Sequence, residues 1–261
     1  MRRSAIHFVL AYLKFLIRST NEHGIHSPFV YNLVTRCFYN GQVFPSYVVL
    51  EDFRQLLLHD DRVIQQTDMG AGSRVFDHSS RRISDIVRKA ASSRARSRLL
   101  NRLTQYIGAH QALELGTSLG MGAASIAAGN ATKVTTIEGC SDTAAVAMEM
   151  FRKTGLAHID LQIGEFTELI SCFPEERKYD LIFIDGNHRR AATLDYFHRL
   201  LPHTHNDSLM IIDDIHWSYE MEMAWAEIKS HSSVRVSIDT FWWGMIFFRK
   251  EQEKEHFVVR L

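Results

Sequence analysis

The chain has little cysteine, no charge imbalance and no long hydrophobic run, and each shortage excludes a class of protein. Only three cysteines occur among 261 residues, far apart and without a Cys-x-x-Cys pair. This argues against a disulfide framework or a structural zinc site and predicts a reducing, cytoplasmic setting. Lysine plus arginine and aspartate plus glutamate both number 30, so the global charge favours neither nucleic acid nor membrane as a partner.

The N-terminal apolar segment, residues 5–17, is shorter than the ~20 residues that span a bilayer. No small-residue cleavage site of a signal peptide follows it. We expect an amphipathic helix that packs on the domain or on a second subunit of a homodimer. The alternative is a peripheral membrane contact through residues 1–20, with basic side chains facing anionic lipid. Those side chains are Arg2, Arg3, Lys14 and Arg18.

Residues 1–108 have helix-period apolar spacing and almost no strand signal. They are expected to form a helical N-terminal extension that acts as a substrate cap, a membrane contact or a dimer contact. The segments predicted to be helical are 29–38, 51–58 and 83–107. Between them, the glycine-containing segment 67–73 reads as a loop, either close to the mouth of an active site as a lid or an ordinary connector.

From residue 109 onward, strands and helices alternate, which defines a second predicted domain, residues 109–261. The candidate strands are 112–115, 134–138, 159–163, 180–185 and 208–213. The candidate helices are 119–129, 142–154, 166–172, 190–200 and 217–230. Apolar strands joined by helical crossovers predict an α/β fold, a parallel sheet with helices on both faces. The last two candidate strands, 234–238 and 243–248, are too close for a crossover and predict an antiparallel hairpin, which brings the sheet to seven strands.

Glycine or acidic residues follow each of the five parallel strands, where ligands bind in sheets of this kind. The first strand runs into a turn containing Gly116, Gly120 and Gly122 and then into an alanine-rich helix. Such a turn brings backbone close to a ligand and aims free N–H groups at it. The glycine order differs from the dinucleotide fingerprint G-x-G-x-x-G. Glu138, 22 residues after Gly116, stands where a carboxylate accepts ribose hydroxyls.

The run from Glu114 to Gly120, followed by Glu138, resembles motif I and the acidic second-strand residue of class I S-adenosylmethionine-dependent methyltransferases. The terminal hairpin is also typical of that Rossmann-like fold, and the resemblance covers about residues 109–250. It implies that S-adenosylmethionine is bound by side chains and backbone after four strands. The implied residues are Glu114, Gly116, Thr117, Ser118 and Gly120 at the methionine end, Glu138 and Gly139 at the ribose, Gly164, Glu165 and Phe166 at the adenine, and Asp185.

A narrower resemblance lies after the fourth and fifth strands, in the segments 184–188 and 212–216. They are similar to metal-dependent O-methyltransferases of the catechol, caffeoyl-CoA and macrocin type. The resemblance implies that Asp185, Asp213 and Asp214 hold a divalent cation. Three carboxylates at one strand edge repel one another unless they are protonated or bridged by a cation. Oxygen ligands in an open site suit Mg²⁺, or Mn²⁺ as second choice.

His188 stands where the catechol-type enzymes have a lysine, as in the macrocin-like relatives. We therefore take Asp185 and His188 as the catalytic pair, with His188 accepting the proton of the acceptor hydroxyl. Structural roles stay open for all of these residues. Asp213 and Asp214 could cap the helix that begins near Trp217, and His188 could be a structural histidine.

The stretch from Arg74 to Arg102 contains nine basic residues against two acids. It is interpreted as a solvated helix face, with anionic small molecules, lipid headgroups or RNA as alternatives. Aromatic residues are sparse there, which argues against a base-stacking surface. Nucleic acid is therefore the least favoured partner.

These patterns predict a methyltransferase that uses S-adenosylmethionine, with Mg²⁺ assisting O-methylation of a small-molecule or lipid-like hydroxyl. One alternative is a methyltransferase acting on RNA, protein or amine without a catalytic metal. Another is a non-catalytic cofactor-binding interaction module. The expected location is the cytoplasm, with membrane association as an additional possibility.

Overall fold

The computed structural model describes residues 2–65, 80–89 and 91–261. They group into two compact units, one of Met1–Asn40 with Pro174–Leu261 and one of Gly41–Phe173. The loop expected at 67–73 lies outside the described residues. The predicted domain boundary at residue 108 rests on the expected functions of the two parts, whereas these units are defined by contacts between residues. The predicted boundary stays a prediction.

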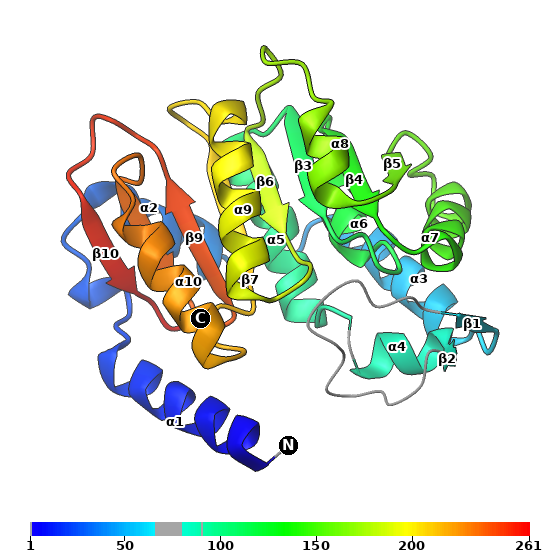
Figure 1. The fold of residues 1–261 in the computed structure, drawn as a ribbon, viewed down its shortest axis with the longest axis horizontal. Helices are drawn as coiled ribbons and strands as arrows, with labels where there is room; N and C mark the ends of the chain where they lie inside the picture. The colour runs from blue at the N-terminus through cyan, green and yellow to red at the C-terminus, as the bar shows by residue number, and fades with distance from the viewer. Residues whose placement is uncertain (1, 66–79, 90) are drawn as a thin grey trace. The chain divides into compact units, whose positions relative to one another are not determined.

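The unit of Gly41–Phe173 contains three parallel strands in the order β3-β4-β5 (Figure 1). Its strands are β3 Gln111–Leu115, β4 Lys133–Glu138 and β5 Asp160–Ile163. Its helices are α3 Ser46–Leu58, α4 Ile83–Lys89, α5 Arg94–Ile107, α6 Met121–Ala127, α7 Ser141–Lys153 and α8 Phe166–Ser171. A separate antiparallel pair consists of β1 Val63–Gln65 and β2 Ser80–Arg82.

A buried asparagine ties the helices of this unit together. Asn101, on the buried face of α5, donates to the backbone oxygens of Ser125 and Ala128 at 2.9 and 2.7 Å. Its own side-chain oxygen accepts from the hydroxyl of Ser46 at 2.7 Å. Because buried polar groups are costly unless they are hydrogen-bonded, this one side chain fixes the packing of α3, α5 and α6.

The other unit contains five strands in the order β10-β8-β9-β7-β6. Its strands are β6 Leu181–Ile184, β7 Leu209–Asp213, β8 Val236–Asp239, β9 Trp243–Phe247 and β10 Glu255–Val258. Its helices are α1 Arg2–Arg18, α2 Pro28–Leu33, α9 Arg190–Leu200 and α10 Tyr219–Ser230. Its short helical turns are Glu22–Gly24, Val34–Phe38 and Leu201–His203. β6 and β7 are parallel, and β8 and β9 form the expected antiparallel hairpin, with β9 against β7.

The predicted α/β class, with a mostly parallel sheet and a terminal hairpin, is confirmed, and three details are corrected. The sheet strands number eight rather than seven, because β10 pairs in parallel with β8. Residues 1–108, expected to be a helical extension with almost no strand signal, also contain the short strands β1 and β2. The helix expected over 83–107 is two helices, α4 and α5. β1, β2 and β10 have three or four residues each, too few for period-two alternation to stand out in the sequence.

Helix α1 packs one face on its own unit. Ala11 and Phe15 are buried against Phe241, and Phe8 lies at the edge of the same cluster. This spacing is the i, i+3, i+7 pattern of an amphipathic helix, so the packing expected on the domain is confirmed. In the described part of the chain, no helix is both long and apolar enough to cross a membrane.

A partly buried histidine links α10 to the β8–β9 turn in this unit. His216 contacts Glu222 of α10 through Nδ1 at 2.8 Å and Asp239 at the end of β8 through Nε2 at 2.9 Å. Its ring stacks on Phe241 at a centroid distance of 5.1 Å. Burial by itself would lower the pKa of His216, but hydrogen bonds to Asp239 and Glu222 outweigh it and raise the pKa to about 9. The imidazolium is therefore the form present at neutral pH.

This cluster predicts a pH-dependent stability. The pKa of His216 is higher in the folded chain than its ordinary 6.5, so its stabilisation is complete below about pH 6.5 and is lost as pH rises through about 9. We expect the gap in unfolding free energy between wild type and His216→Gln to shrink by about 3 kcal/mol over that range. Urea denaturation followed by circular dichroism measures it, with the exposed His23→Gln as control. A gap that does not change with pH would contradict the charged cluster.

Candidate functional site

The loop after β3 needs residues that accept left-handed backbone. Gly116, Ser118 and Gly120 all have positive φ, of 99°, 48° and 89°. At Gly120 a side chain is also blocked, because a Cβ atom would lie 2.7 Å from the Phe151 ring and 3.2 Å from the Phe53 ring. The glycine spacing read from the sequence therefore has two physical causes here, backbone conformation and close packing.

Two threonines connect this loop to the buried end of β3. The hydroxyl of Thr136, on β4, donates to Glu114 Oε2 at 2.5 Å and lies 2.6 Å from the hydroxyl of Thr117. Burial raises the pKa of Glu114 to about 8; the Thr136 hydrogen bond opposes that rise and the nearby Glu138 adds to it. Glu114 is thus mostly protonated at neutral pH, and a cation nearby would favour its ionised form.

Glu138 joins the ends of β3 and β4. Its Oε2 accepts from the backbone N–H of Ser118 at 2.7 Å and its Oε1 from that of Cys140 at 2.9 Å. Burial raises the pKa of Glu138, while hydrogen bonds from backbone amides oppose the rise. A carboxylate held this way by amides beside a glycine loop can accept hydroxyl donors from a sugar.

The end of the third parallel strand, β5, runs into a capped helix, α8. Gly164 leaves β5 with a φ of 159°, and its N–H donates to the backbone oxygen of Glu138 at 3.0 Å. Glu165 caps α8, since its carboxylate accepts from the N–H of Glu168 at 3.0 Å and from the Thr167 hydroxyl. The carboxylate of Glu165 therefore has a structural role at the start of Phe166–Ser171, and contact of Gly164, Glu165 and Phe166 with adenine stays a prediction.

The acidic residues after β6 and β7 leave neighbouring strands at the same edge. These strands are parallel, with Ile184 opposite Ile212, so Asp185 and Asp213 follow positions that lie side by side. Asp213 is buried and Asp185 is partly exposed. His188 Nε2 lies 3.8 Å from Asp185 Oδ1, an ion-pair distance rather than a hydrogen bond. The proposed catalytic pair is therefore adjacent.

The capping role left open for Asp213 and Asp214 belongs to another residue. Helix α10 is capped by the side chain of Ser218, which accepts from Met221 N–H at 3.2 Å. Asp214 instead has a φ of 54° and accepts the N–H of Trp217 through its backbone oxygen at 2.8 Å. Ser218 is therefore the N-cap residue of α10.

The carboxylates fit a hard cation in kind, but they are not gathered into a ligand group. Asp185, Asp213 and Asp214 supply the oxygen atoms that Mg²⁺ prefers. Within residues 2–65, 80–89 and 91–261, however, no three histidine, cysteine or acidic residues lie close enough together to hold a metal ion. Binding a cation would have to draw these side chains together, and the metal site stays a prediction.

Sequence reasoning passed over Asn187, between the two proposed catalytic residues. Its Nδ2 donates to the Tyr196 hydroxyl at 3.0 Å, and its φ is 63°. Its Oδ1 is buried and accepts no hydrogen bond from any described residue. An amide oxygen beside Asp185 is a further group able to face a polar ligand. The only signal in the sequence is the Gly-Asn pair, which is typical of turns.

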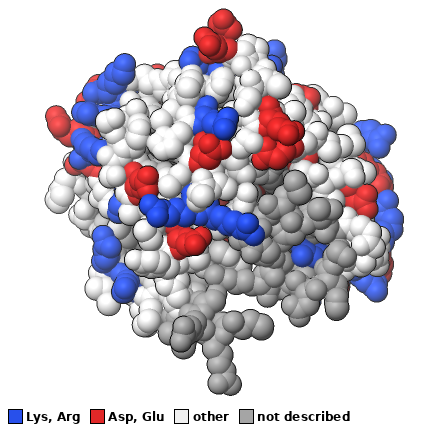
Figure 2. Space-filling model, viewed as in Figure 1, with Lys and Arg blue, Asp and Glu red and all other residues white. Residues whose placement is uncertain are grey.

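The basic stretch is largely paired with other side chains where the structure describes it; Arg74 lies outside. The ion pairs are Arg82–Asp61 at 3.1 Å, Arg88–Asp85 at 3.6 Å and Arg94–Glu51 at 2.6 Å. Arg98 lies over the ring of Tyr47 at 4.9 Å, and Arg102 donates to its hydroxyl at 3.0 Å. Figure 2 shows basic and acidic side chains interspersed on the drawn face. These contacts favour a solvated, charge-paired surface.

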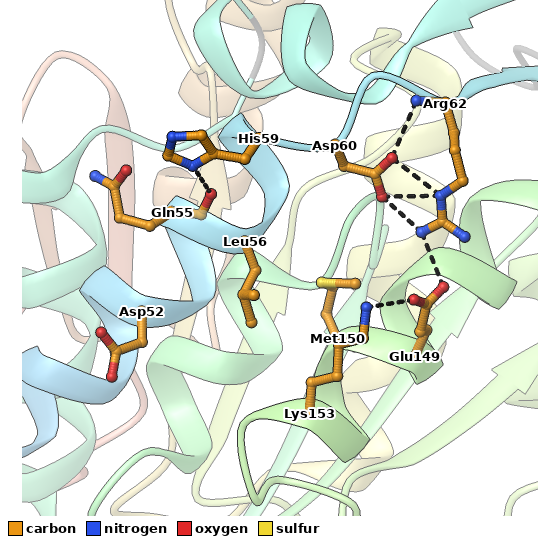
Figure 3. A pocket seen from close by; sticks show the side chains of 9 residues that line it. All are labelled: Asp52, Gln55, Leu56, His59, Asp60, Arg62, Glu149, Met150 and Lys153. Atoms are coloured by element: carbon orange, nitrogen blue, oxygen red, sulfur yellow. Dashed lines mark hydrogen bonds and ion pairs between the residues drawn. The ribbon is translucent and has the colours of Figure 1, made fainter.

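A hollow of about 710 Å³ lies between α3 and α7. Figure 3 shows the Arg62 side chain between Asp60 and Glu149, with Lys153 beside Glu149. Arg62 pairs with Asp60 at 2.5 Å and with Glu149 at 2.9 Å, and Lys153 pairs with Glu149 at 2.6 Å. The hollow lies at the C-terminal end of α7, whereas Glu138 lies just before the N-terminal end of that helix. This hollow is therefore not the candidate site.

Comparison with known proteins bears on the loops after β3 and β4. Residues 113–215 match the family described as a methyltransferase domain, whereas no curated protein matches the sequence. The structure resembles the SAH-bound O-methyltransferase of Bacillus cereus, with TM-score 0.56 and 16% identity over 83% of this chain and 96% of that one. It also resembles a SAH-bound methyltransferase of Podospora anserina, with TM-score 0.58 and 14% identity over 86% and 97%.

A third solved structure with this fold is the O-methyltransferase TomG of Streptomyces achromogenes, in complex with SAM. Its TM-score is 0.53 at 17% identity, over 60% of this chain and 81% of that one. At such low sequence identities, structural similarity shows only the fold. The evidence for a methyltransferase domain is the sequence match of residues 113–215. Residues 113–215 therefore match a methyltransferase domain, and the chain has the fold of the solved methyltransferases.

Proposed function

We propose that this protein transfers the methyl group of S-adenosylmethionine to a hydroxyl oxygen of a small-molecule or lipid-like acceptor, assisted by a divalent cation. The observation that carries the proposal is the capture of Glu138 by the amides of Ser118 and Cys140. It puts a carboxylate next to a glycine turn at adjoining strand ends, as ribose binding needs. The Bacillus cereus and TomG structures, both described as O-methyltransferases, support oxygen as the acceptor atom.

The proposed chemistry needs alignment and removal of a proton. The acceptor oxygen attacks the sulfonium methyl carbon as the carbon–sulfur bond breaks, which leaves S-adenosylhomocysteine. Holding donor and acceptor in line can contribute ~7–11 kcal/mol. His188 takes the hydroxyl proton, and Asp185, 3.8 Å away, stabilises the imidazolium that forms.

Asp185, Asp213 and Asp214 would hold the cation. When bound, a divalent cation lowers the pKa of an acceptor hydroxyl and fixes its orientation. The carboxylate donors support this assignment, as does the side-by-side start of the loops after β6 and β7.

The choice of acceptor is assigned to residues 1–108 and to the loops that follow β6 and β7. A homodimer and a cytoplasmic location remain part of the proposal. All three cysteines are free thiols, which is compatible with a reducing compartment. Nucleic acid is not proposed as the substrate, since the described basic stretch is mostly paired.

The first prediction from this proposal concerns Glu138. Replacing it with alanine removes two charge-assisted contacts, so we expect affinity for S-adenosylhomocysteine to fall by roughly tenfold to a hundredfold. Isothermal titration calorimetry measures the affinity. The exposed Glu175→Ala variant is the matched control and should bind as wild type does. Unchanged affinity in a folded Glu138→Ala protein would refute the cofactor assignment.

A second prediction follows from Glu114, whose pKa is about 8. S-adenosylmethionine brings positive charge, which favours the ionised carboxyl, so binding at about pH 7 should release roughly one proton. Calorimetry in buffers of different ionisation enthalpy measures this release. It should vanish in Glu114→Gln and persist in Glu175→Gln. Wild-type heats that do not depend on the buffer would contradict a role for Glu114 at the donor.

The third prediction tests the cation. We expect one Mn²⁺ bound per chain, detected by electron paramagnetic resonance, and loss of that binding in Asp214→Ala but not in the exposed Asp207→Ala. Chelation should lower methyl transfer by about a hundredfold or more, because the cation is worth several kcal/mol. Transfer is measured on lipid, small-molecule and RNA fractions of cell extract. Full activity in EDTA would refute the metal but leave the methyltransferase proposal intact.

A further inference from the structure

Helix α1 has a second apolar face that its own unit leaves uncovered. Val9, Leu10, Leu13 and Ile17 are between 49% and 85% exposed. Val9, Leu13 and Ile17 recur every four residues and therefore share one side of the helix. That side is opposite the Ala11–Phe15 face, which packs on Phe241. An apolar row of this length on a packed, ordered helix indicates a surface that is covered by something else.

The edges of this outward face carry side chains that prefer a membrane interface. Lys14 and Arg18 are exposed along one edge. Along the other, Tyr12 is 44% exposed and Trp242, 5.6 Å from the Phe8 ring, is 39% exposed. Lysine and arginine reach phosphate groups while their alkyl stems lie along apolar surface, and tyrosine and tryptophan concentrate at the headgroup level.

The charge of this segment selects the kind of partner. Residues 1–21 contain no aspartate or glutamate, whereas α1 contains four basic residues, Arg2, Arg3, Lys14 and Arg18. Two copies of α1 brought face to face would therefore place basic side chains against basic side chains, with no acidic residue of the helix to pair them. An anionic surface is complementary along the whole helix.

We propose that the outward face of α1 docks in the plane of an anionic lipid bilayer. The apolar row enters the boundary between headgroups and acyl chains, and the basic edge contacts lipid phosphates and carboxylates. The helix does not have the length and hydropathy to cross a bilayer, so it lies along the surface. This proposal stands apart from the chemistry of methyl transfer, since none of these residues is assigned to the donor, the cation or the removal of the proton.

The test is cosedimentation of the full chain with vesicles of phosphatidylcholine containing phosphatidylserine. We expect Leu13→Glu combined with Ile17→Glu to lower partitioning at least about tenfold, because apolar burial is replaced by charge repulsion. Lys14→Glu with Arg18→Glu should abolish the preference for anionic over neutral vesicles. Val43→Glu, which changes a residue 78% exposed outside α1, is the matched control and should partition as wild type does.

A second measurement does not depend on how the α1 variants fold. Brominated lipids should quench wild-type fluorescence through Trp242, and Trp242→Phe should remove that component. Wild-type partitioning no greater than that of the Leu13/Ile17 variant, or absence of quenching, overturns the proposal. So does a concentration-dependent dimer, seen by sedimentation velocity, that the same two substitutions dissociate, because the face would then belong to a second copy of the chain. Binding of S-adenosylhomocysteine tests the methyltransferase proposal separately.

Discussion

The carboxylate of Glu138 fixes the geometry of the loops after β3 and β4, because it accepts hydrogen bonds from both of them. Its two oxygens accept from Ser118 and Cys140, while the backbone oxygen of Ile137 accepts from Gly116 and Thr117. The loop after β3 that is held by these hydrogen bonds contains three residues with positive φ, Gly116, Ser118 and Gly120. The glycines are therefore where the backbone must turn, and Glu138 decides which way the loop amides point.

The other unit is organised by a charged cluster rather than a glycine turn. His216, Glu222 and Asp239 come from three segments, and their hydrogen bonds keep the imidazole protonated despite burial. Breaking a buried ion cluster by removing one member is costly, because the remaining charges are left unpaired. The same histidine stacks on Phe241, on which α1 packs. Phe241 therefore contacts both α1 and the histidine of the ion cluster.

How much of this could be read from the sequence depends on the range of the interactions involved. The five parallel strands and the helices between them follow from apolar runs and periodicity, which are local, and their predicted bounds agree with the structure to within about two residues. β10 was missed because its four residues become a strand only by pairing with β8. Glu165 caps α8 through its carboxylate, a role that the sequence analysis did not assign, and its expected contact with adenine stays a prediction.

The sequence by itself determined the α/β architecture, the glycine turn, the acidic residue that ends β4 and the chemical type of the residues after β6 and β7. These are properties of short segments, in which spacing and side-chain type carry the information. Only the tertiary structure decided that His216 is a charged link and that one face of α1 is buried while the other is open. Each of these depends on which distant segments meet, and burial and pairing set the protonation and the role of a side chain only after that meeting has occurred.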